Sequence, residues 1–331
     1  FDHELVRSWL DTCDSTHNCV DTLKAQETVP GLRVIDVQDC CVIPAPNACR
    51  YSALSYVWGR IQQPLLMSDN VELLRRKGSL DLLAIPQTIK DAMHLCRLLG
   101  LQYLWVDSLC LVQDSSHAAE QIAQMHNIYH DAYIAIVVAA GHDCASGIPS
   151  IQPRPSFPSK VMIDHRPFAV VPHCFDAVEP RVRNSIWAER SWTMQEAALS
   201  RRRLVFTSQE IFLSCYEGHF VEALDGKLLQ PHPVSMPPLP RVKPGQSFTA
   251  ADKRRAELSY VRIASLYVGR KLTYPEDILR AFEGMANALS PLLGPFAWGH
   301  PHSLFRYSMC WSSYAQIQRR PGFPSWSWAG W

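Results

Sequence analysis

The sequence shows no excess of charge of either sign. Its 331 residues include 32 Lys and Arg and 31 Asp and Glu, so the formal net charge at neutral pH is only +1. A protein that binds DNA or RNA normally carries a basic face. The only compact basic cluster here, Arg201–Arg203, is more typical of a solvated helix end. The composition therefore argues against a nucleic-acid partner.

Long hydrophobic runs are also missing. The longest unbroken apolar stretch, 134–140, is far shorter than the ~20 residues that a helix needs to span a bilayer. The first residues, FDHE, contain neither the basic start nor the apolar segment of a targeting peptide. The sequence therefore predicts a protein without a membrane partner, located in the cytoplasm.

The cysteine content does not indicate a disulfide framework. Eleven cysteines are present, an odd number, and several lie in apolar periodic segments, such as Cys96, Cys110 and Cys215. Buried thiols behave as small hydrophobic side chains, so this pattern indicates a reducing compartment. The 47% apolar content and ten tryptophans predict a sizeable core, and the length suits one large domain or a domain with an appendage.

An alternation of strands and helices begins at residue 51. Such an order is typical of an α/β fold with a parallel sheet, right-handed crossovers and helices on both faces. We predict about five strands in flavodoxin-like order. Ligands of these sheets bind outside the carboxyl ends of the strands, so the residues that follow each strand are the first functional candidates. The predicted strands are 51–56, 101–106 and 133–140, and the helices between them are 86–99 and 118–132.

Composition divides the chain into four parts. A Pro-rich insertion at 141–187 interrupts the second of these parts and contains a predicted β-hairpin at 161–171. A helix at 188–199 and two strands, 204–206 and 211–215, follow the insertion. The four parts are an N-terminal segment (1–50), the α/β core (51–222), a Pro-rich linker (223–250) and a helical C-terminal lobe (251–331).

Polar and aromatic residues gather after the predicted strands and on the helix that follows the insertion. The strings that contain them are ALSYVWG, WVDSLCLVQD and ERSWTMQEAALS, and the chain closes on PSWSWAGW. These strings resemble the signature blocks and the closing segment of the fungal HET (heterokaryon incompatibility) domain. The resemblance covers the chain from about Trp9 to its end. It implies a cytosolic cell-death effector of fungal non-self recognition.

HET domains are in turn thought to be distant relatives of TIR domains, and the elements correspond. ALSYVWG takes the place of the first TIR strand, and YLWVD that of a second strand ending in aspartate. Trp192-x-x-x-Glu196 has the spacing of the TIR helix whose glutamate serves NAD⁺ cleavage. The insertion at 141–187 precedes this helix, which departs from the TIR pattern. The resemblance implies a TIR-like fold, self-association, and NAD⁺ glycohydrolase activity with Glu196 as the catalytic residue.

One carboxylate suits this chemistry. Cleavage of the nicotinamide–ribose bond needs an anion beside an oxocarbenium-like centre, and no strong general acid is required because the leaving group is already cationic. Glu196 would supply the carboxylate. Aromatic rings would pack against the nicotinamide, a second carboxylate would bind a ribose hydroxyl, and a guanidinium would contact phosphate. The nucleotide-binding candidates are Tyr56, Trp58, Trp105, Asp107 and Arg190, and we expect them to gather around Glu196 at the carboxyl edge of the sheet.

These residues also have structural interpretations. Glu196 could form an ion pair with Arg190 or Arg201, Asp107 could orient a loop backbone, and a buried Trp is usually part of the core. Two further functions stay open on the sequence alone. One is a non-catalytic, TIR-like module that signals by homotypic assembly, and the other is a small-molecule enzyme of secondary metabolism that shares the scaffold.

A separate group of soft metal ligands lies in the N-terminal segment. Cys13, His17 and Cys19 fall within seven residues, and the pair Cys40-Cys41 follows about twenty residues later. Three such ligands and a fourth across a short strand could form a tetrahedral zinc site. Cys41 is our candidate for the fourth ligand. The spacing matches no standard Cys-x₂-Cys knuckle, and a cluster of ordinary buried thiols is the alternative.

Overall fold

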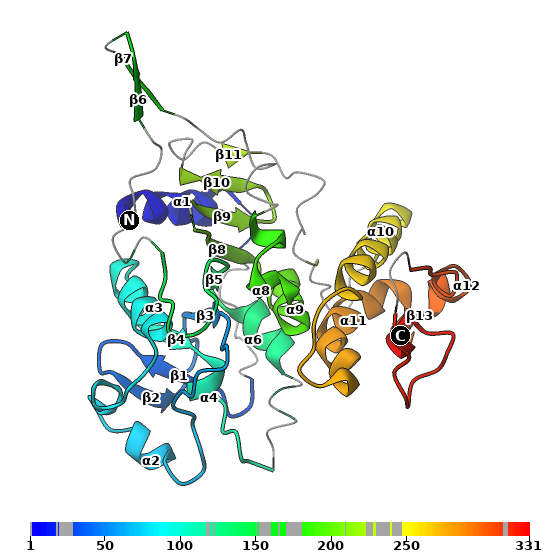
Figure 1. The fold of residues 1–331 in the computed structure, drawn as a ribbon, viewed down its shortest axis with the longest axis horizontal. Helices are drawn as coiled ribbons and strands as arrows, with labels where there is room; N and C mark the ends of the chain where they lie inside the picture. The colour runs from blue at the N-terminus through cyan, green and yellow to red at the C-terminus, as the bar shows by residue number, and fades with distance from the viewer. Residues whose placement is uncertain are drawn as a thin grey trace.

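In a computed structural model of the protein, the chain forms an α/β body and a smaller helical lobe (Figure 1). Each has a hydrophobic core of its own. The residues that the structure describes are 2–17, 19, 29–116, 120, 122, 124–149, 151, 160–164, 166–169, 181–208, 210–222, 228–229, 239, 247–313 and 317–331.

Among the described residues, a nine-stranded sheet crosses the α/β body in the order β11-β10-β9-β8-β5-β3-β4-β1-β2. The four inner strands β4, β3, β5 and β8 are parallel, and the strands outside them pair antiparallel. Connections too short for a crossover helix join successive antiparallel strands, such as β1 and β2. The strands are β1 (Arg33–Asp36), β2 (Cys41–Pro44), β3 (Tyr51–Ser55), β4 (Tyr103–Trp105), β5 (Ile134–Val138), β8 (Arg202–Phe206), β9 (Ile211–Cys215), β10 (His219–Val221) and β11 (Leu228–Leu229).

The parallel centre agrees with the α/β fold predicted from the sequence. Along the chain the parallel strands are β3, β4, β5 and β8, and across the sheet they take the order second, first, third, fourth. A flavodoxin-like sheet begins in the same order. The prediction of about five parallel strands is incomplete, because antiparallel strands extend the sheet on both sides.

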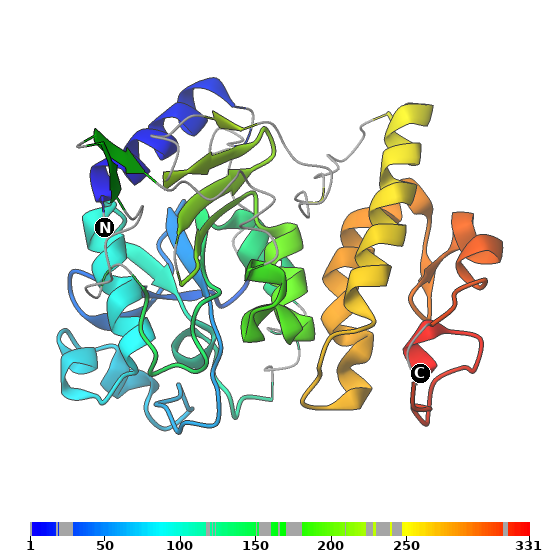
Figure 2. The ribbon, with the colours of Figure 1, turned by 45° about the horizontal axis from the view of Figure 1, so that its top comes forward.

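Helices cover both faces of this sheet (Figure 2). Along β3 the side chains alternate between the two helical layers. Ser52 Oγ contacts Cys96 Sγ of α3 at 2.9 Å, whereas the Tyr51 hydroxyl donates a hydrogen bond to the Ile128 carbonyl of α6 at 2.7 Å. The helices of the α/β body are α1 (His3–Thr16), α2 (Val71–Leu74), η1 (Ser79–Leu82), α3 (Gln87–Leu98), α4 (Asp107–Cys110), α6 (Met125–Asp131), α8 (Ile186–Glu189) and α9 (Ser191–Leu199).

Local sequence signals account for the best-predicted elements. Pro86 occupies the N-cap of α3, and Gly100 adopts a φ of 71° just beyond the end of this helix. The predicted helix at 86–99 is therefore confirmed. All five residues of β5 are buried, as expected of a parallel strand covered on both faces.

Two predicted segments are described only in part. Within the insertion, β6 (Lys160–Ile163) and β7 (Arg166–Ala169) pair antiparallel as a separate two-stranded sheet. Residues 150, 152–159, 165 and 170–180 lie outside the described part of the chain, and so does most of the predicted linker at 223–250.

The C-terminal lobe packs against α9, so the same helix contacts the α/β body and the lobe. Met194 and Ala198 of α9 belong to the hydrophobic core of the lobe, together with Phe282 and Leu289 of α11. No helix of the described residues is both long and apolar enough to cross a membrane. The elements of the lobe are α10 (Ala250–Tyr267), η3 (Pro275–Ile278), α11 (Arg280–Leu293), β12 (Phe296–Ala297), β13 (His300–Pro301), η4 (His302–Leu304), α12 (Phe305–Ser308) and η5 (Trp328–Gly330).

The close approach of α11 to α9 depends on Gly284. Its backbone N–H donates a hydrogen bond to Gln195 Oε1 at 3.0 Å, and a Cβ atom at this position would lie 2.7 Å from that oxygen and 2.5 Å from His126 Cβ. We expect Gly284→Ala to lower the free energy of unfolding by about 1–3 kcal/mol, because the helices must move apart. Urea denaturation measures this loss. Gly269→Ala is the control, since a Cβ there meets nothing within 4 Å, and equal midpoints for the two variants would contradict the close contact.

Candidate functional site

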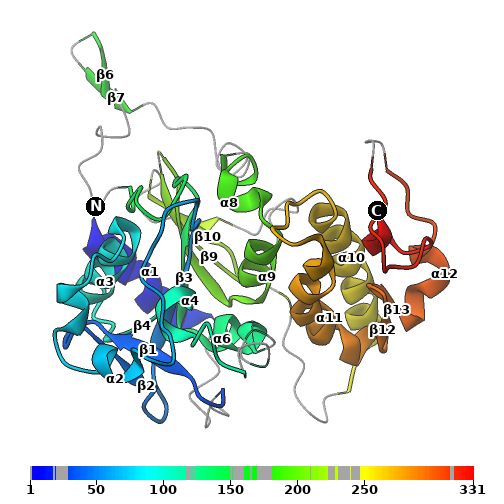
Figure 3. The same ribbon diagram turned by 60° about the horizontal axis from the view of Figure 1, so that its bottom comes forward.

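Glu196 lies on a helix that is buried on nearly every side. All residues of α9 except Trp192 are buried, because the helix lies between the sheet and the helical lobe (Figure 3). The Glu196 side chain points toward the end of β3, where Ser55 Oγ donates a hydrogen bond to Glu196 Oε2. Trp187 Nε1 of α8 donates in turn to Ser55 Oγ at 2.7 Å. The carboxyl group thus connects the central strand with both helices that follow the insertion.

Burial controls the charge of this carboxyl group. Only 6% of the Glu196 surface is exposed, and burial raises the pKa of Glu196 to about 7. The Ser55 hydrogen bond and the positive charge of Arg190 oppose this increase in pKa, while the charge of Asp107 adds to it. Glu196 is therefore near its ionisation midpoint at neutral pH.

Asp107 follows β4 directly and opens α4. Its carboxylate accepts hydrogen bonds from Trp58 Nε1, at 3.1 Å to Oδ1 and 2.9 Å to Oδ2, and from the Ser108 backbone N–H at 2.8 Å. Burial raises the pKa of Asp107 to about 6, against the effect of Arg190 and of these hydrogen bonds. Asp107 thus joins the loop after β3 to the end of β4.

Arg190, between α8 and α9, is electrostatically coupled to both carboxyl groups. Its Nη1 donates a hydrogen bond to the Tyr56 carbonyl at 2.8 Å, and its charge opposes the pKa increases of Glu196 and Asp107. Arg190 is partly exposed. Residues from three distant parts of the sequence therefore meet at the carboxyl ends of β3 and β4, where the topology of the sheet predicts a ligand site.

Residues 51–196 match the family model of the heterokaryon incompatibility protein (HET). This segment is a HET domain. The match begins at the first residue of β3 and ends at Glu196, so it contains the whole arrangement described above. Membership implies involvement in heterokaryon incompatibility. No curated protein and no solved structure matches the chain.

Two aromatic candidates of the HET domain are buried in its core. Trp105 is fully buried within β4 and packs edge-on against Tyr129 of α6, with 5.5 Å between ring centroids. Tyr56 is 3% exposed, and its hydroxyl is hydrogen-bonded to Ser108 Oγ and Gln63 Oε1. Strand alternation turns the Trp105 ring toward α6 and away from the sheet edge, and its assignment to a nucleotide site stays a prediction. Trp58 remains the partly exposed ring beside Asp107.

Among the described residues, the structure shows no ion pair between Glu196 and either arginine that the sequence suggested as its partner. Arg201 pairs with Asp131 at 3.5 Å, and Arg190 donates to a backbone carbonyl. Three residues around Glu196 were not identified from the sequence, namely Ser55, Trp187 and Tyr129. Ser55 could have been found, because residues 51, 53 and 55 of a strand point to the same face.

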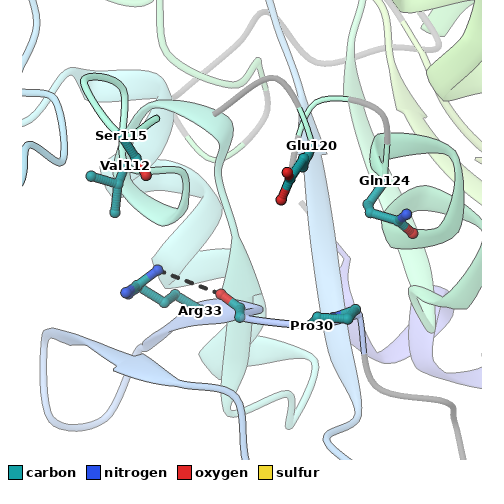
Figure 4. Close-up of a pocket in the computed structure, with 7 residues that line it drawn as sticks. Pro30, Arg33, Val112, Ser115, Glu120 and Gln124 are labelled. Atoms are coloured by element: carbon teal, nitrogen blue, oxygen red, sulfur yellow. Dashed lines mark hydrogen bonds between the residues drawn. The ribbon is translucent and has the colours of Figure 1, made fainter. Parts of the chain in front are cut away.

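A cavity of about 610 Å³ lies at the same edge of the sheet (Figure 4). Because β1 runs antiparallel to β4, Arg33 at the start of β1 lies beside the carboxyl end of β4. The cavity walls carry one positive and one negative side chain, Arg33 and Glu120, and also include Val112 and Gln124. The lining includes neither Glu196 nor Asp107, so the cavity is separate from the carboxyl pair.

Three of the four predicted metal ligands meet at the opposite edge of the sheet, beside the start of β8. The ligand atoms of Cys13, His17, Cys19 and Cys215 all lie within 4.8 Å of one another, and such a group could hold a metal ion. The fourth member is Cys215 at the end of β9, where the sequence suggested Cys41. Cys41 lies on β2 at the far edge of the sheet, and proximity along the sequence gave no indication that β9 passes beside α1.

Proposed function

We propose that this HET domain cleaves NAD⁺ at the nicotinamide–ribose bond and acts as a cell-death effector in fungal non-self recognition. The observation that supports this most directly is the buried Glu196 carboxyl at the carboxyl edge of the parallel strands. Burial places its pKa at about 7, and Asp107 and Arg190 act on the same group. An anion held in a dry environment stabilises a developing cation more strongly than an anion in water does.

Each residue has a role in the proposed reaction. The Glu196 carboxylate stabilises the oxocarbenium-like ribose, Asp107 binds a ribose hydroxyl, and Arg190 contacts a phosphate. The partly exposed Trp58 ring packs against the nicotinamide. Water adds to the anomeric carbon as the bond to nicotinamide breaks, so the products are nicotinamide, ADP-ribose and a proton. Tyr56 is a positioning residue, because its ring is buried against α4.

Glu196 is buried, so a substrate can reach it only after neighbouring residues move, and we propose that the loop that follows β3 makes this movement. The Trp58 carbonyl accepts a hydrogen bond from the Cys144 N–H at 3.2 Å, and a Cβ at Gly59 would lie 2.4 Å from Asp143 Cβ. The loop is thus packed against residues 142–144. We propose that substrate binding and self-association of the domain displace it. We also propose residues 51–222 as the TIR-like core and residues 251–331 as the lobe that supports α9.

The proposal is tested by incubating the purified chain with NAD⁺ and separating the products by chromatography. We expect nicotinamide and ADP-ribose in equal amounts, increasing with time and with protein concentration. The incubation is repeated at high protein concentrations, because the proposal includes self-association of the domain. The absence of both products over the whole concentration range would refute NAD⁺ cleavage.

A non-catalytic signalling module is the second candidate. The observation in its favour is the same burial of Glu196, since a hydrogen-bonded carboxyl between β3 and α9 can serve as a structural connection. This candidate predicts concentration-dependent assembly without NAD⁺ turnover. Light scattering on the samples of the NAD⁺ experiment distinguishes the two functions.

A further inference from the structure

The group of thiols and imidazole at the end of α1 is assembled from two distant parts of the chain. Cys13 and His17 are separated by one helical turn and therefore lie on the same side of α1. Cys19 follows two residues later, and Cys215 ends β9. His17 Nδ1 lies 3.4 Å from Cys215 Sγ. All four residues lie outside the HET domain match.

The chemistry and the spacing of these side chains suit zinc. Three cysteines and one histidine are a common ligand set of structural zinc sites. With Zn–S bonds of about 2.3 Å and Zn–N bonds of about 2.0 Å, tetrahedral geometry places the ligand atoms roughly 3.3–3.8 Å apart. The observed 3.4 Å lies in this range, and the limit of 4.8 Å for the whole group leaves only small side-chain adjustments. Thiolates also select zinc over magnesium or calcium, which prefer oxygen ligands.

The surroundings already favour negative charge on sulfur. Backbone N–H groups of Glu217 and Gly218 donate hydrogen bonds to the Cys215 sulfur. Backbone donors of this kind are typical of the outer shell of a metal site. A buried thiolate needs a positive partner, and a metal ion between the sulfurs would provide it.

We propose that Cys13, His17, Cys19 and Cys215 bind one Zn²⁺ ion, which fastens α1 to the β9–β10 part of the sheet. The site is structural, because four protein ligands complete the tetrahedron and leave no position for a substrate. The ion holds α1 beside β10, where Trp9 and His17 stack on Phe220 at centroid distances of 6.2 and 5.9 Å.

The proposal is tested by measuring the metal content of the full chain. The protein is produced with zinc in the medium and purified without chelator. We expect one zinc per chain, and Co²⁺ in its place should give the visible absorption of a tetrahedral thiolate complex. In His17→Ala the zinc affinity should fall at least tenfold. Loss of an outer-shell partner lowers metal affinity by about 10–100-fold, and loss of a direct ligand should lower it at least as much. Competition with a chromophoric chelator measures the affinity. His17 is partly exposed, so this change opens no cavity in the core.

Matched variants keep the result interpretable. Cys41→Ser changes a buried cysteine outside the group and should bind zinc as the wild type does. His17→Cys retains four ligands and should retain the metal even if His17→Ala folds poorly. Zinc far below one per chain with no cobalt spectrum would overturn the proposal. So would equal zinc affinity in His17→Ala and wild type, or a disulfide between any two of the three cysteines in the purified protein.

Discussion

Glu196→Gln should reduce the rate of NAD⁺ cleavage by about 100-fold or more, because the variant loses the anion that stabilises the oxocarbenium-like centre. Glutamine keeps the shape of the side chain and can still accept the hydrogen bond from Ser55. The packing of α9 should therefore persist. Initial rates of nicotinamide release, normalised to folded protein, measure the effect.

The control for this substitution is Glu283→Gln, the same chemical change at an exposed position of α11. It should leave the rate unchanged. If Glu196 is only a structural connection, Glu196→Gln should instead lower stability and leave the activity per folded molecule intact. That pattern would contradict the catalytic role.

The parallel centre of the fold was predictable because its signals are local. β5 is a continuous apolar run, and α3 has Pro86 before it and Gly100 after it. The antiparallel margins have no comparable signal. β1, β2 and β10 are only three or four residues long, and pairing with a neighbour stabilises them more than their own composition does.

The candidate site was predictable to the level of segments and less so to the level of side chains. The rule that ligands bind at the carboxyl ends of parallel strands pointed to Asp107, and the resemblance to HET and TIR domains pointed to the segment that carries Arg190 and Glu196. The rule could not decide which aromatic rings face the edge, because Trp105 belongs to the strand and packs against Tyr129. The metal-ligand group shows the same limit. Cys215 lies beside Cys13 only because of the path that β9 takes, and Cys41 does not belong to the group.

Raising the pH from about 5 to about 8 should destabilise the wild-type protein more than the Glu196→Gln variant. Burial raises the pKa of Glu196 from its usual value of 4.5, which holds in the unfolded chain, to about 7 in the folded state. Between these values the folded state binds more protons than the unfolded state, so the free energy of unfolding decreases as the pH rises. Asp107, with a pKa raised from 3.8 to about 6, acts in the same direction.

Because one pKa unit corresponds to about 1.4 kcal/mol, Glu196 alone should remove about 3 kcal/mol of stability as the pH rises through this window. Urea denaturation at several pH values measures the difference between Glu196→Gln and wild type. We expect the two proteins to be equally stable near pH 4.5 and the variant to gain its advantage by pH 7, with no further change above. Glu283→Gln should follow the wild-type curve. A constant difference across the range would show that Glu196 is not a buried, neutralised carboxyl. A difference in stability between variant and wild type that grows with pH would show that Glu196 becomes charged in the folded protein and that this charge lowers stability. A catalytic carboxylate in a dry site must carry its charge in this way.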